Sequence, residues 1–355
     1  MLAALLVLAS VVDLSPELRT AADRASLPAI QATVTKSAGN GASGTTGIAV
    51  LDRPMRVRAT DPFHIGSCAK PFTATIVAML VEERKLDWET KIADVFPEWK
   101  DVMQPAYSSV TLADLLSHES GLPAFGDDAD FVGLPPFPGA TVERRRAFAR
   151  YVLTLPPAAP PRSAYVYSNA GFVVAAAMAD KVSGRPWEWW IRKRIFRPLH
   201  MRSAGIGWPR RVWGHEAADD GRLTPVDPRG KYQLPDYLAP AGDLQMSADD
   251  LAAFLRAHLR AMRGEKTLIS PATSAALHTK RLRSALGFGS AAVAGFENVA
   301  TYSGSAGTFF TVIAIAADGD VAVAVSANAG NEAAQKTVGQ LLKGYLARFA
   351  TSKAE

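Results

Sequence analysis

Ser67 and Lys70 are the residues of this chain whose types and spacing most directly suggest chemistry. If the stretch opens a helix, the hydroxyl and the amine lie on one face, about one turn apart. A helix N-terminus also carries a positive dipole and free amides, which favour negative charge developing on a substrate. The alternative is that Ser67 only caps the helix and that Lys70 is solvated, because serine caps are common.

The residues after Ser67 predict a helix. Apolar side chains recur at helical spacing from Ile76 to Val81, and a polar run at 82–85 ends the pattern. Pro71 is compatible with this prediction, because the N–H groups of a first helical turn have no partner within the helix. Ser67 is therefore predicted at a helix N-terminus.

Two further stretches carry side chains suited to chemistry. Tyr167 and Asn169 form the only Tyr-x-Asn of the chain, ahead of a helical pattern at 172–182. A tyrosine in a turn and an asparagine N-cap would also explain this pair. The stretch 302–305 reads Tyr-Ser-Gly-Ser at the start of a predicted hairpin. Gly304 within a strand indicates a close approach of the backbone to another group, for example a ligand, or a plain bulge.

Together and in this order, the three stretches resemble the motifs of the penicillin-recognising serine hydrolases. That family comprises class C β-lactamases, D-Ala-D-Ala carboxypeptidases and related esterases. The segments 115–123 (Leu-Leu-Ser-His-Glu-Ser-Gly-Leu-Pro) and 241–251 (Ala-Gly-Asp-Leu-Gln-Met-Ser-Ala-Asp-Asp-Leu) are also similar to the family pattern. The resemblance covers about residues 47–327 and implies the split α/β architecture of the family.

The resemblance implies a role for each motif residue. Ser67 would be the acylated nucleophile, and Lys70, with a depressed pKa, would help to remove its proton. Tyr167 would serve as general acid and base, first for the leaving group and then for the deacylating water. Asn169 would position the lysine or the substrate amide. The backbone N–H groups of Ser67 and Ser305 would form the oxyanion hole.

Two positions depart from the family pattern. The third motif usually opens with Lys or His, whose cation helps to hold a substrate carboxylate, and here the residue is Tyr302. Some members have a substrate-binding glutamine where this chain has Phe125. We count Tyr302, Gly304 and Phe125 among the expected substrate-contacting residues. The departures favour an esterase or peptidase, with a true class C β-lactamase or a D-Ala-D-Ala carboxypeptidase as the alternative.

Other classes of protein are disfavoured. The chain has no Gly-x-Ser-x-Gly elbow, and its six histidines are scattered without a His-Glu-x-x-His motif. Cys68 is the only cysteine, so we expect neither an intrachain disulfide nor a cysteine-based metal site, and no cofactor. His118 is expected to be structural. The rival from another class is a non-catalytic binding or sensor relative, although such a protein has no need of Ser67, Lys70 and Tyr167 together.

Composition limits the partners. The 355 residues are 48% hydrophobic and 21% charged, which is typical of a globular protein, and the net charge is +5. Basic clusters at 144–146 and 192–194 come without a nucleic-acid motif, so we expect solvated faces and no nucleic-acid partner. The expected partner is a small-molecule or peptide substrate, and the oligomeric state is open.

The first twelve residues are apolar. A run at 1–12 is too short to span a bilayer and resembles the hydrophobic part of a signal peptide, although a basic n-region and a clear cleavage site are missing. The run favours a periplasmic or secreted protein without a membrane span in the mature chain. The alternative is a packed N-terminal helix in a cytoplasmic protein.

Helices and strands are predicted along the whole chain. We expect strands at both ends and a helical middle, which predicts an α/β fold: one antiparallel sheet built from both termini, flanked by helices, with an inserted mostly helical lobe. The sheet lobe would comprise 13–75 and 285–355 and the helical lobe 76–284, together one β-lactamase-like domain. The predicted elements are a helix at 16–35, a loop at 39–44, strands at 46–52, 55–60, 286–290, 299–303, 308–317 and 320–327, and a helix at 332–349.

Overall fold

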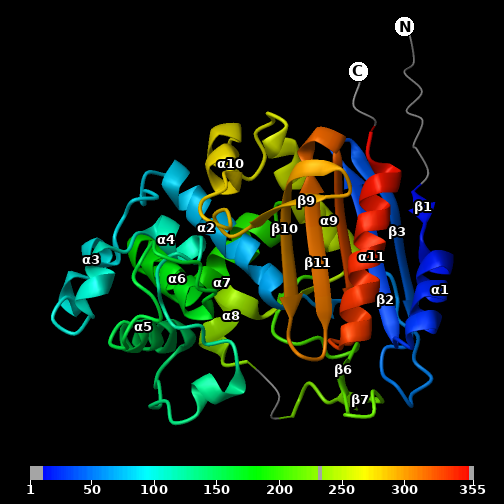
Figure 1. Ribbon diagram of the computed structural model, residues 1–355, viewed down its shortest axis with the longest axis horizontal. Helices are drawn as coiled ribbons and strands as arrows, with labels where there is room; N and C mark the ends of the chain where they lie inside the picture. The colour runs from blue at the N-terminus through cyan, green and yellow to red at the C-terminus, as the bar shows by residue number, and fades with distance from the viewer. Residues whose placement is uncertain (1–10, 231–233, 352–355) are drawn as a thin grey trace, which may run out of the picture.

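The computed structural model describes residues 11–230 and 234–351 and has a sheet on one side and a group of helices on the other (Figure 1). The predicted signal-peptide segment at 1–12 lies outside the described residues except for its last two. Within the described residues, no helix is both long enough and apolar enough to cross a membrane.

The main sheet joins strands from both ends of the chain. In the described part of the chain it has seven strands in the order β1-β3-β2-β12-β11-β10-β9. All neighbouring pairs are antiparallel except β1 and β3. This arrangement confirms the predicted α/β fold class. The strands are β1 (Val12–Asp13), β2 (Ala29–Lys36), β3 (Gly39–Gly47), β9 (Gly289–Val293), β10 (Phe296–Ser305), β11 (Phe310–Ala316) and β12 (Val321–Ala327).

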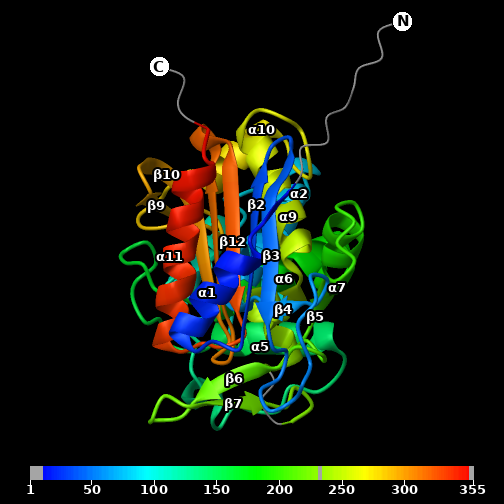
Figure 2. The ribbon, with the colours of Figure 1, turned by 90° about the vertical axis from the view of Figure 1, so that its right-hand side faces the viewer.

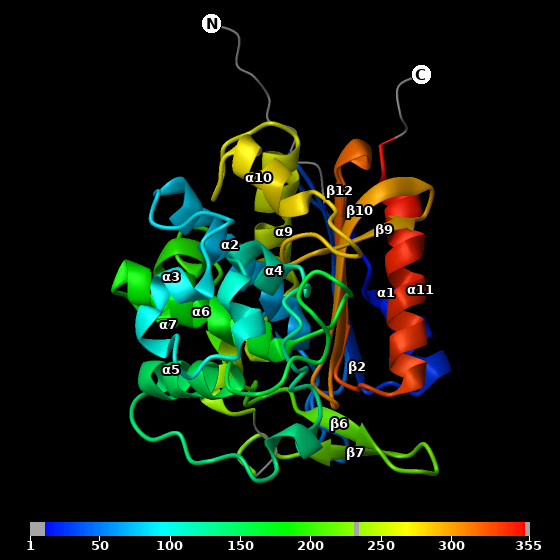
Figure 3. The same cartoon turned by 60° about the vertical axis from the view of Figure 1, so that its left-hand side comes forward.

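Helices cover both faces of this sheet. The helices α1 (Ser15–Ala25) and α11 (Glu332–Phe349) lie on one face, and α9 (Ala248–Met262) lies on the other with the remaining helices beyond it (Figures 2 and 3). Every residue of the central strand β12 is buried, as expected for a strand covered on both faces. The sheet is therefore an interior layer that can fix the position of a neighbouring turn.

The middle of the chain is mostly helical. It also contains two small sheets, one of β4 (Phe63–His64), β8 (Leu244–Met246) and β5 (Gly205–Ile206), and one of β6 (Gly214–Ala217) and β7 (Leu223–Val226). The helices are α2 (Lys70–Glu82), α3 (Ile92–Val95), α4 (Leu112–Leu116), α5 (Thr141–Val152), α6 (Asn169–Ser183), α7 (Trp187–Trp190), α8 (Ala239–Gly242) and α10 (Pro271–His278).

The predicted helix at 16–35 is wrong in its second half. Helix α1 ends at Ala25, and Ser26 takes a left-handed conformation with φ 51°. Pro28 then disfavours a helix, and the run after it is rich in β-branched residues that suit a strand. This run forms β2, which pairs with β12 on one side and with β3 on the other.

The predicted loop at 39–44 is also wrong, because these residues belong to strand β3. Its small residues are required by packing: a Cβ on Gly44 would lie 2.5 Å from the backbone nitrogen of Ser15, where helix α1 begins. The predicted strands at 46–52 and 55–60 are wrong beyond Gly47, where one bridge between Ile48 and Arg56 replaces them.

The C-terminal prediction is confirmed. The four strands expected from residue 286 onward correspond to β9, β10, β11 and β12, with differences of a few residues at their ends, and the terminal helix has the expected bounds. The turn between β11 and β12 contains Asp318 and Gly319, as the hairpin signal predicted.

A buried arginine holds three helices of the middle region together. The guanidinium of Arg145 on α5 donates to the carboxylate of Asp180 on α6 at 2.8 Å and, through two nitrogens, to that of Glu188 on α7 at 2.9 Å. The Arg145 side chain has no exposed surface. Burial raises the pKa of Asp180 to about 6, although the arginine opposes this shift. The cluster thus holds the C-terminal part of α6, the helix that begins at Asn169, against α5 and α7.

We expect Arg145→Met to lower the free energy of unfolding by about 3–5 kcal/mol, because it leaves two carboxylates without their buried cation. The matched control is Arg146→Met, which removes a half-exposed partner of Glu98 and should change stability by less than about 1 kcal/mol. Urea unfolding of both variants measures the difference. Equal effects would contradict a special role for the buried cluster.

Candidate active site

Ser67 lies in a tight turn rather than in the helix itself. Residues Gly66–Ala69 form a 3₁₀ turn, and α2 begins at Lys70. The prediction of a helix from Ser67 is thus wrong by three residues, but Ser67 does precede the helix N-terminus. Gly66 has a positive φ of 51°, which a glycine adopts readily.

The turn is pressed against the end of strand β10. A Cβ on Gly304 would lie 2.1 Å from the backbone oxygen of Ile65 and 2.7 Å from the backbone nitrogen of Ser67. A Cβ on Gly66 would lie 2.7 Å from the backbone nitrogen of Ser305. The group that approaches Gly304 is therefore the backbone of the Ser67 turn.

The hydroxyl of Ser67 contacts the two other side chains that the motifs predicted. The Ser67 Oγ lies 2.6 Å from the Tyr167 Oη and 3.0 Å from the Lys70 Nζ. These three residues come from the 3₁₀ turn, helix α2 and the loop before α6. Tertiary structure thus brings the Ser-x-x-Lys and Tyr-x-Asn motifs into direct contact.

Lys70 is completely buried and has no ion pair among the described residues. Its Nζ lies 2.6 Å from the Asn169 Oδ1 and 2.7 Å from the carbonyl oxygen of Ala241, besides the contact with Ser67. Burial penalises the ammonium, so the pKa of Lys70 is well below its usual value of 10.5. Polar contacts without a carboxylate therefore hold a lysine that loses its proton readily.

Asn169 orients the lysine, and its neighbour caps the helix. The Asn169 Nδ2 donates to the carbonyl oxygen of Phe125 at 2.8 Å, which directs the Oδ1 towards Lys70. The N-cap of α6 is Ser168, whose Oγ accepts from the backbone N–H of Gly171 at 3.0 Å. The alternative that Asn169 is an N-cap is therefore wrong, and its amide is free to bind the lysine.

Tyr167 is protonated at neutral pH. Burial raises the pKa of its phenol to about 12, although the hydrogen bond with Ser67 opposes this shift. The Lys70 Nζ lies 4.8 Å from the centre of the Tyr167 ring, so the lysine covers one face of the phenol. Tyr167 can thus donate a proton to a group bound at Ser67.

Tyr302 lies on β10 beside Tyr167. Its Oη is 3.1 Å from the Nε2 of His118, and its phenol acts to lower the pKa of Tyr167. Burial holds the pKa of Tyr302 well above 10. The residue that replaces the usual Lys or His of the third motif is therefore a neutral phenol in contact with the predicted site.

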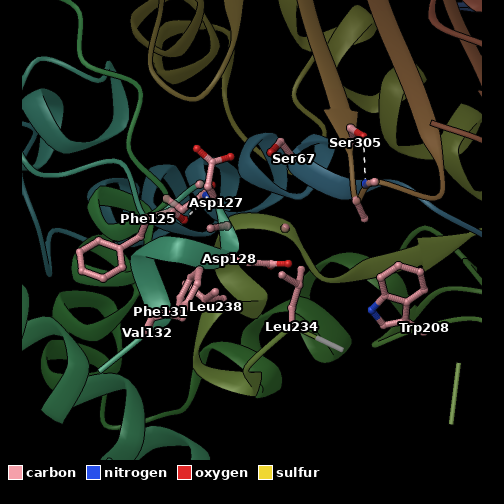
Figure 4. Close-up of a pocket in the computed structure, with 16 residues that line it drawn as sticks. Ser67, Phe125, Asp127, Asp128, Phe131, Val132, Trp208, Leu234, Leu238 and Ser305 are labelled. Carbon is pink, nitrogen blue, oxygen red and sulfur yellow. Dashed lines mark hydrogen bonds between the residues drawn. The ribbon is translucent and has the colours of Figure 1, made fainter. Parts of the chain in front are cut away.

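Phe125 contributes to the site mainly through its backbone. Its φ is 49°, and its ring turns away from Ser67 to contact the rings of Phe131 and Phe148, with centroids 5.8 and 5.0 Å apart (Figure 4). The Phe125 carbonyl oxygen is the one that holds the Asn169 amide. The ring forms part of an apolar wall of the adjoining cavity.

Two adjoining cavities meet at Ser67. The first has a volume of about 750 Å³, and Figure 4 shows Ser67 and Ser305 at one end of it. The second, of about 550 Å³, lies on the side of Tyr167 and Tyr302. Both cavities are lined in part by Ser67, Asn169 and Ser305. The apolar side chains of the first cavity are Phe125, Phe131, Val132, Trp208, Leu234 and Leu238.

The charges around the cavities have one sign. Among the described residues that line the first cavity, the charged ones are Asp127 and Asp128, and neither lysine nor arginine is present. The described lining of the second cavity contains no carboxylate, lysine or arginine. His118 in that lining is neutral, because burial and the nearby Lys70 lower its pKa to about 3.

A buried support under the Ser67 turn was missed by the motif analysis. The Nδ1 of His64 accepts from the backbone N–H of Gly66 at 3.2 Å, and its Nε2 lies 2.9 Å from the Oδ1 of Asp243. The indole of Trp208 stacks on the imidazole with centroids 4.6 Å apart. One signal was available in the segment 241–251: the similar segment of the penicillin-recognising serine hydrolases begins Ala-Gly-Gly-Leu, and Asp243 stands in place of its second glycine.

Other potential reactive groups do not form a metal site. No cluster of three or more His, Cys, Asp or Glu side chains suited to a metal ion occurs in residues 11–230 and 234–351. Cys68 is buried, and burial raises the pKa of its thiol. Its sulfur lies 3.7 Å from the carbonyl oxygen of Thr311, so the thiol packs against the sheet.

Sequence comparisons find hydrolases and penicillin-binding proteins. The chain is 29% identical over 223 residues to the unguisins hydrolase ungD of Aspergillus violaceofuscus, which is 59% of this chain and 38% of that protein. It is 29% identical over 247 residues to penicillin-binding protein 4 of Amycolatopsis lactamdurans, which is 67% of this chain and 62% of that protein. The chain thus spans only part of the length of these relatives.

Solved structures share the fold. The octameric penicillin-binding protein homologue of Pyrococcus abyssi has a TM-score of 0.76 and 23% identity, over 93% of this chain and 76% of that chain. The D-amino acid amidase of Ochrobactrum anthropi SV3 has a TM-score of 0.73 and 20% identity, over 92% of this chain and 94% of that chain.

The family model described as Beta-lactamase matches residues 17–343, which include Ser67, Lys70, Tyr167 and the strand that carries Tyr302. This match extends over most of the chain and agrees with the shared fold. The protein therefore belongs to the β-lactamase family.

Proposed function

We propose that this protein is a serine hydrolase that cleaves an ester or amide through a covalent acyl-enzyme on Ser67. The observation that carries the proposal is the contact of the Ser67 Oγ with both the Lys70 Nζ and the Tyr167 Oη beside a cavity. Relatives named as a hydrolase and an amidase support it. A periplasmic or secreted location is part of the proposal and rests on the apolar residues 1–12.

Lys70 acts as the base for Ser67. Two of its three polar contacts, the Asn169 Oδ1 and the Ala241 carbonyl oxygen, can only accept hydrogen bonds. A neutral amine has two N–H donors for these acceptors and one lone pair for the third direction. That direction is occupied by the Ser67 Oγ at 3.0 Å. The depressed pKa of Lys70 and the geometry together support proton transfer from Ser67 to Lys70.

Tyr167 acts on the other side of Ser67. In acylation the Ser67 oxygen attacks the acyl carbon, and the phenol of Tyr167 gives its proton to the departing oxygen or nitrogen. In deacylation the phenolate takes a proton from water, whose oxygen attacks the acyl carbon. The departing Ser67 oxygen then regains its proton from Lys70. Protons balance over the cycle, and the 2.6 Å contact between the two hydroxyl oxygens supports this path.

The oxyanion that forms on the acyl carbon needs preorganised donors. The backbone N–H groups of Ser67 and Ser305 serve this purpose in the proposal, since the 3₁₀ turn and the end of β10 are pressed together at Gly66 and Gly304. Both serines line both cavities. Loss of one such donor typically costs about 10²–10³-fold in rate.

The substrate is expected to be uncharged near the acyl carbon. In the β-lactamase family the third motif usually supplies a cation, and here Tyr302 supplies a neutral phenol. The described lining of the two cavities offers no lysine or arginine for a carboxylate, while Asp127 and Asp128 would repel one. These charges favour an esterase or peptidase over a true β-lactamase or a D-Ala-D-Ala carboxypeptidase.

A non-catalytic binding or sensor protein is the second candidate function. A binding site for an uncharged ligand would need the cavities and the apolar wall. It would not need a completely buried lysine, because burial of an ammonium without a paired anion is costly. The combination of Lys70, Ser67 and Tyr167 therefore favours catalysis.

Ser67 is expected to react with a fluorophosphonate and to gain the mass of one adduct. Ser67→Ala should abolish the adduct and lower ester hydrolysis by at least about 10³-fold, because the nucleophile is lost. The control is Ser163→Ala, which changes an exposed loop serine and should retain the adduct. Intact-protein mass spectrometry decides the question. An unlabelled wild type, or equal labelling of Ser67→Ala, would contradict the enzyme proposal.

The protein should prefer short-chain aryl esters to cephalosporins. A sharper comparison uses one cephalosporin as the free carboxylate and as its methyl ester, because the two differ mainly in charge. We expect kcat/KM to be about tenfold higher or more for the methyl ester, since a buried polar group left without a hydrogen-bond partner costs about 1–3 kcal/mol and a charged group costs more. Faster hydrolysis of the free carboxylate would overturn the substrate assignment.

The stability of the protein should depend on pH through Lys70. The unfolded chain holds this proton up to about pH 10.5, and the folded protein releases it at a much lower pH. Between the two pKa values the unfolded state binds more protons, so the free energy of unfolding rises with pH, by about 1.4 kcal/mol per unit from this group. Lys70→Met should remove that slope.

Urea unfolding at several pH values in this window measures the slope for wild type and Lys70→Met. The informative quantity is the difference between the two proteins, because all other titrating groups are shared. Parallel curves would show that the pKa of Lys70 is not depressed by folding. Activity is expected to fall on acidification through the same pKa, since the protonated amine cannot accept the Ser67 proton.

A further inference from the structure

The phenol of Tyr302 links a buried histidine to the proposed site. Its Oη lies 3.1 Å from the His118 Nε2, and its phenol lines the second cavity together with that of Tyr167. Tyr302 is on strand β10, whereas His118 follows helix α4 and Tyr167 precedes α6. The three side chains therefore meet only in the folded protein.

A backbone amide fixes the direction of the first hydrogen bond. The backbone N–H of Ser168 donates to the His118 Nδ1 at 3.1 Å, so this nitrogen is an acceptor. A neutral imidazole with an acceptor at Nδ1 carries its proton on Nε2. The pKa of His118, lowered to about 3, keeps the ring neutral at physiological pH. The His118 Nε2–H therefore donates to the Tyr302 oxygen.

The remaining hydrogen bonds then have a single direction. Because the Tyr302 oxygen accepts from His118, its own proton is available for the Tyr167 oxygen. Tyr167 in turn has its proton available for the Ser67 Oγ at 2.6 Å. Neutral Lys70 completes the chain by accepting from Ser67. In this order the step that remains to be inferred is the one from Tyr302 to Tyr167.

We propose that Tyr302 is a positioning residue that donates its phenolic proton in a hydrogen bond to the Tyr167 oxygen, in a direction set by His118. The inference rests on the proposed serine hydrolase function. When Tyr167 gives its proton to the leaving group, its O–H bond breaks and a new bond to hydrogen forms on the departing atom. The phenolate that remains accepts the Tyr302 hydrogen bond, which stabilises it until water returns a proton.

The other groups around Tyr167 are poorly placed to stabilise its phenolate, which makes the hydrogen bond from Tyr302 important in this step. In the described part of the chain, no carboxylate or guanidinium interacts with the Tyr167 phenol. Lys70 lies over the ring rather than at the oxygen, 4.8 Å from its centre. The titratable groups that face Tyr167 are Lys70 on α2, Cys68 on the 3₁₀ turn, His118 after α4, Tyr165 before α6 and Tyr302 on β10.

The test is Tyr302→Phe, which retains the ring and removes the donor. Two esters of the same acid are compared, a 4-nitrophenyl ester and an ethyl ester. The nitrophenolate oxygen can leave without being protonated, whereas the ethoxide oxygen must receive a proton as it leaves. We expect kcat/KM to fall by about tenfold or more for the ethyl ester and by less than about threefold for the nitrophenyl ester. This split is a property of proton donation that a structural role would not produce.

The matched control is Tyr165→Phe, which removes a neighbouring phenol that packs edge-on against His118, with centroids 5.3 Å apart. It should change kcat/KM of the two esters by the same factor. An equal fall for both esters in Tyr302→Phe, or no fall in either, would overturn the proposal. Fluorophosphonate labelling separates this failure from failure of the proposed function, since only the latter leaves the wild type unlabelled.

A measurement on the wild type does not depend on folding of the variant. In a protein labelled with ¹⁵N in its imidazole rings, the shifts of His118 should report a neutral ring with its proton on Nε2 between pH 5 and 9. A proton on Nδ1, or a charged ring in that range, would reverse the direction of the chain and overturn the proposal.

Discussion

Burial of Lys70, which has no counter-ion in the described part of the chain, is the constraint on which the rest of the site depends. An ammonium in this position is costly, so burial holds the pKa of Lys70 well below its usual value. Two obligate acceptors, the Asn169 Oδ1 and the Ala241 carbonyl oxygen, accept hydrogen bonds from its Nζ, which also lies 3.0 Å from the Ser67 Oγ. The elements around α2 can be understood as the scaffold for this arrangement.

The scaffold is rigid where the chemistry requires it. The Ser67 turn is in contact with β10 at Gly304, where no Cβ would fit, and it rests on the buried contact between His64 and Asp243. On the opposite side, Arg145 joins α5 to the C-terminal part of α6, at Asp180, and to α7. The central sheet thus fixes one wall of the site, and the buried ion cluster helps to fix the other.

The lack of a lysine or arginine in the described lining of the two cavities distinguishes this protein from the usual pattern of its family. Tyr302 takes the position of a cation and turns its hydroxyl towards His118 and Tyr167. The same substitution therefore removes a binding group for carboxylates and supplies a hydrogen-bond donor next to the proposed general acid. The acidic side chains Asp127 and Asp128 at the first cavity also disfavour anionic substrates, because they would repel a carboxylate.

The sequence by itself determined the fold class, the C-terminal hairpin and helix, and the residues Ser67, Lys70, Tyr167 and Asn169 that the structure brings together. These features depend on short motifs and on regular hydrophobic patterns. Only the tertiary structure decided that β2 and β3 are strands, because pairing with β12 and close packing against α1 outweigh local helix or loop preferences. It also decided the partners of Lys70 and the contact between Tyr302 and His118. Those side chains are 184 residues apart, and no local pattern encodes a contact between segments that meet only when the sheet and the helices pack together.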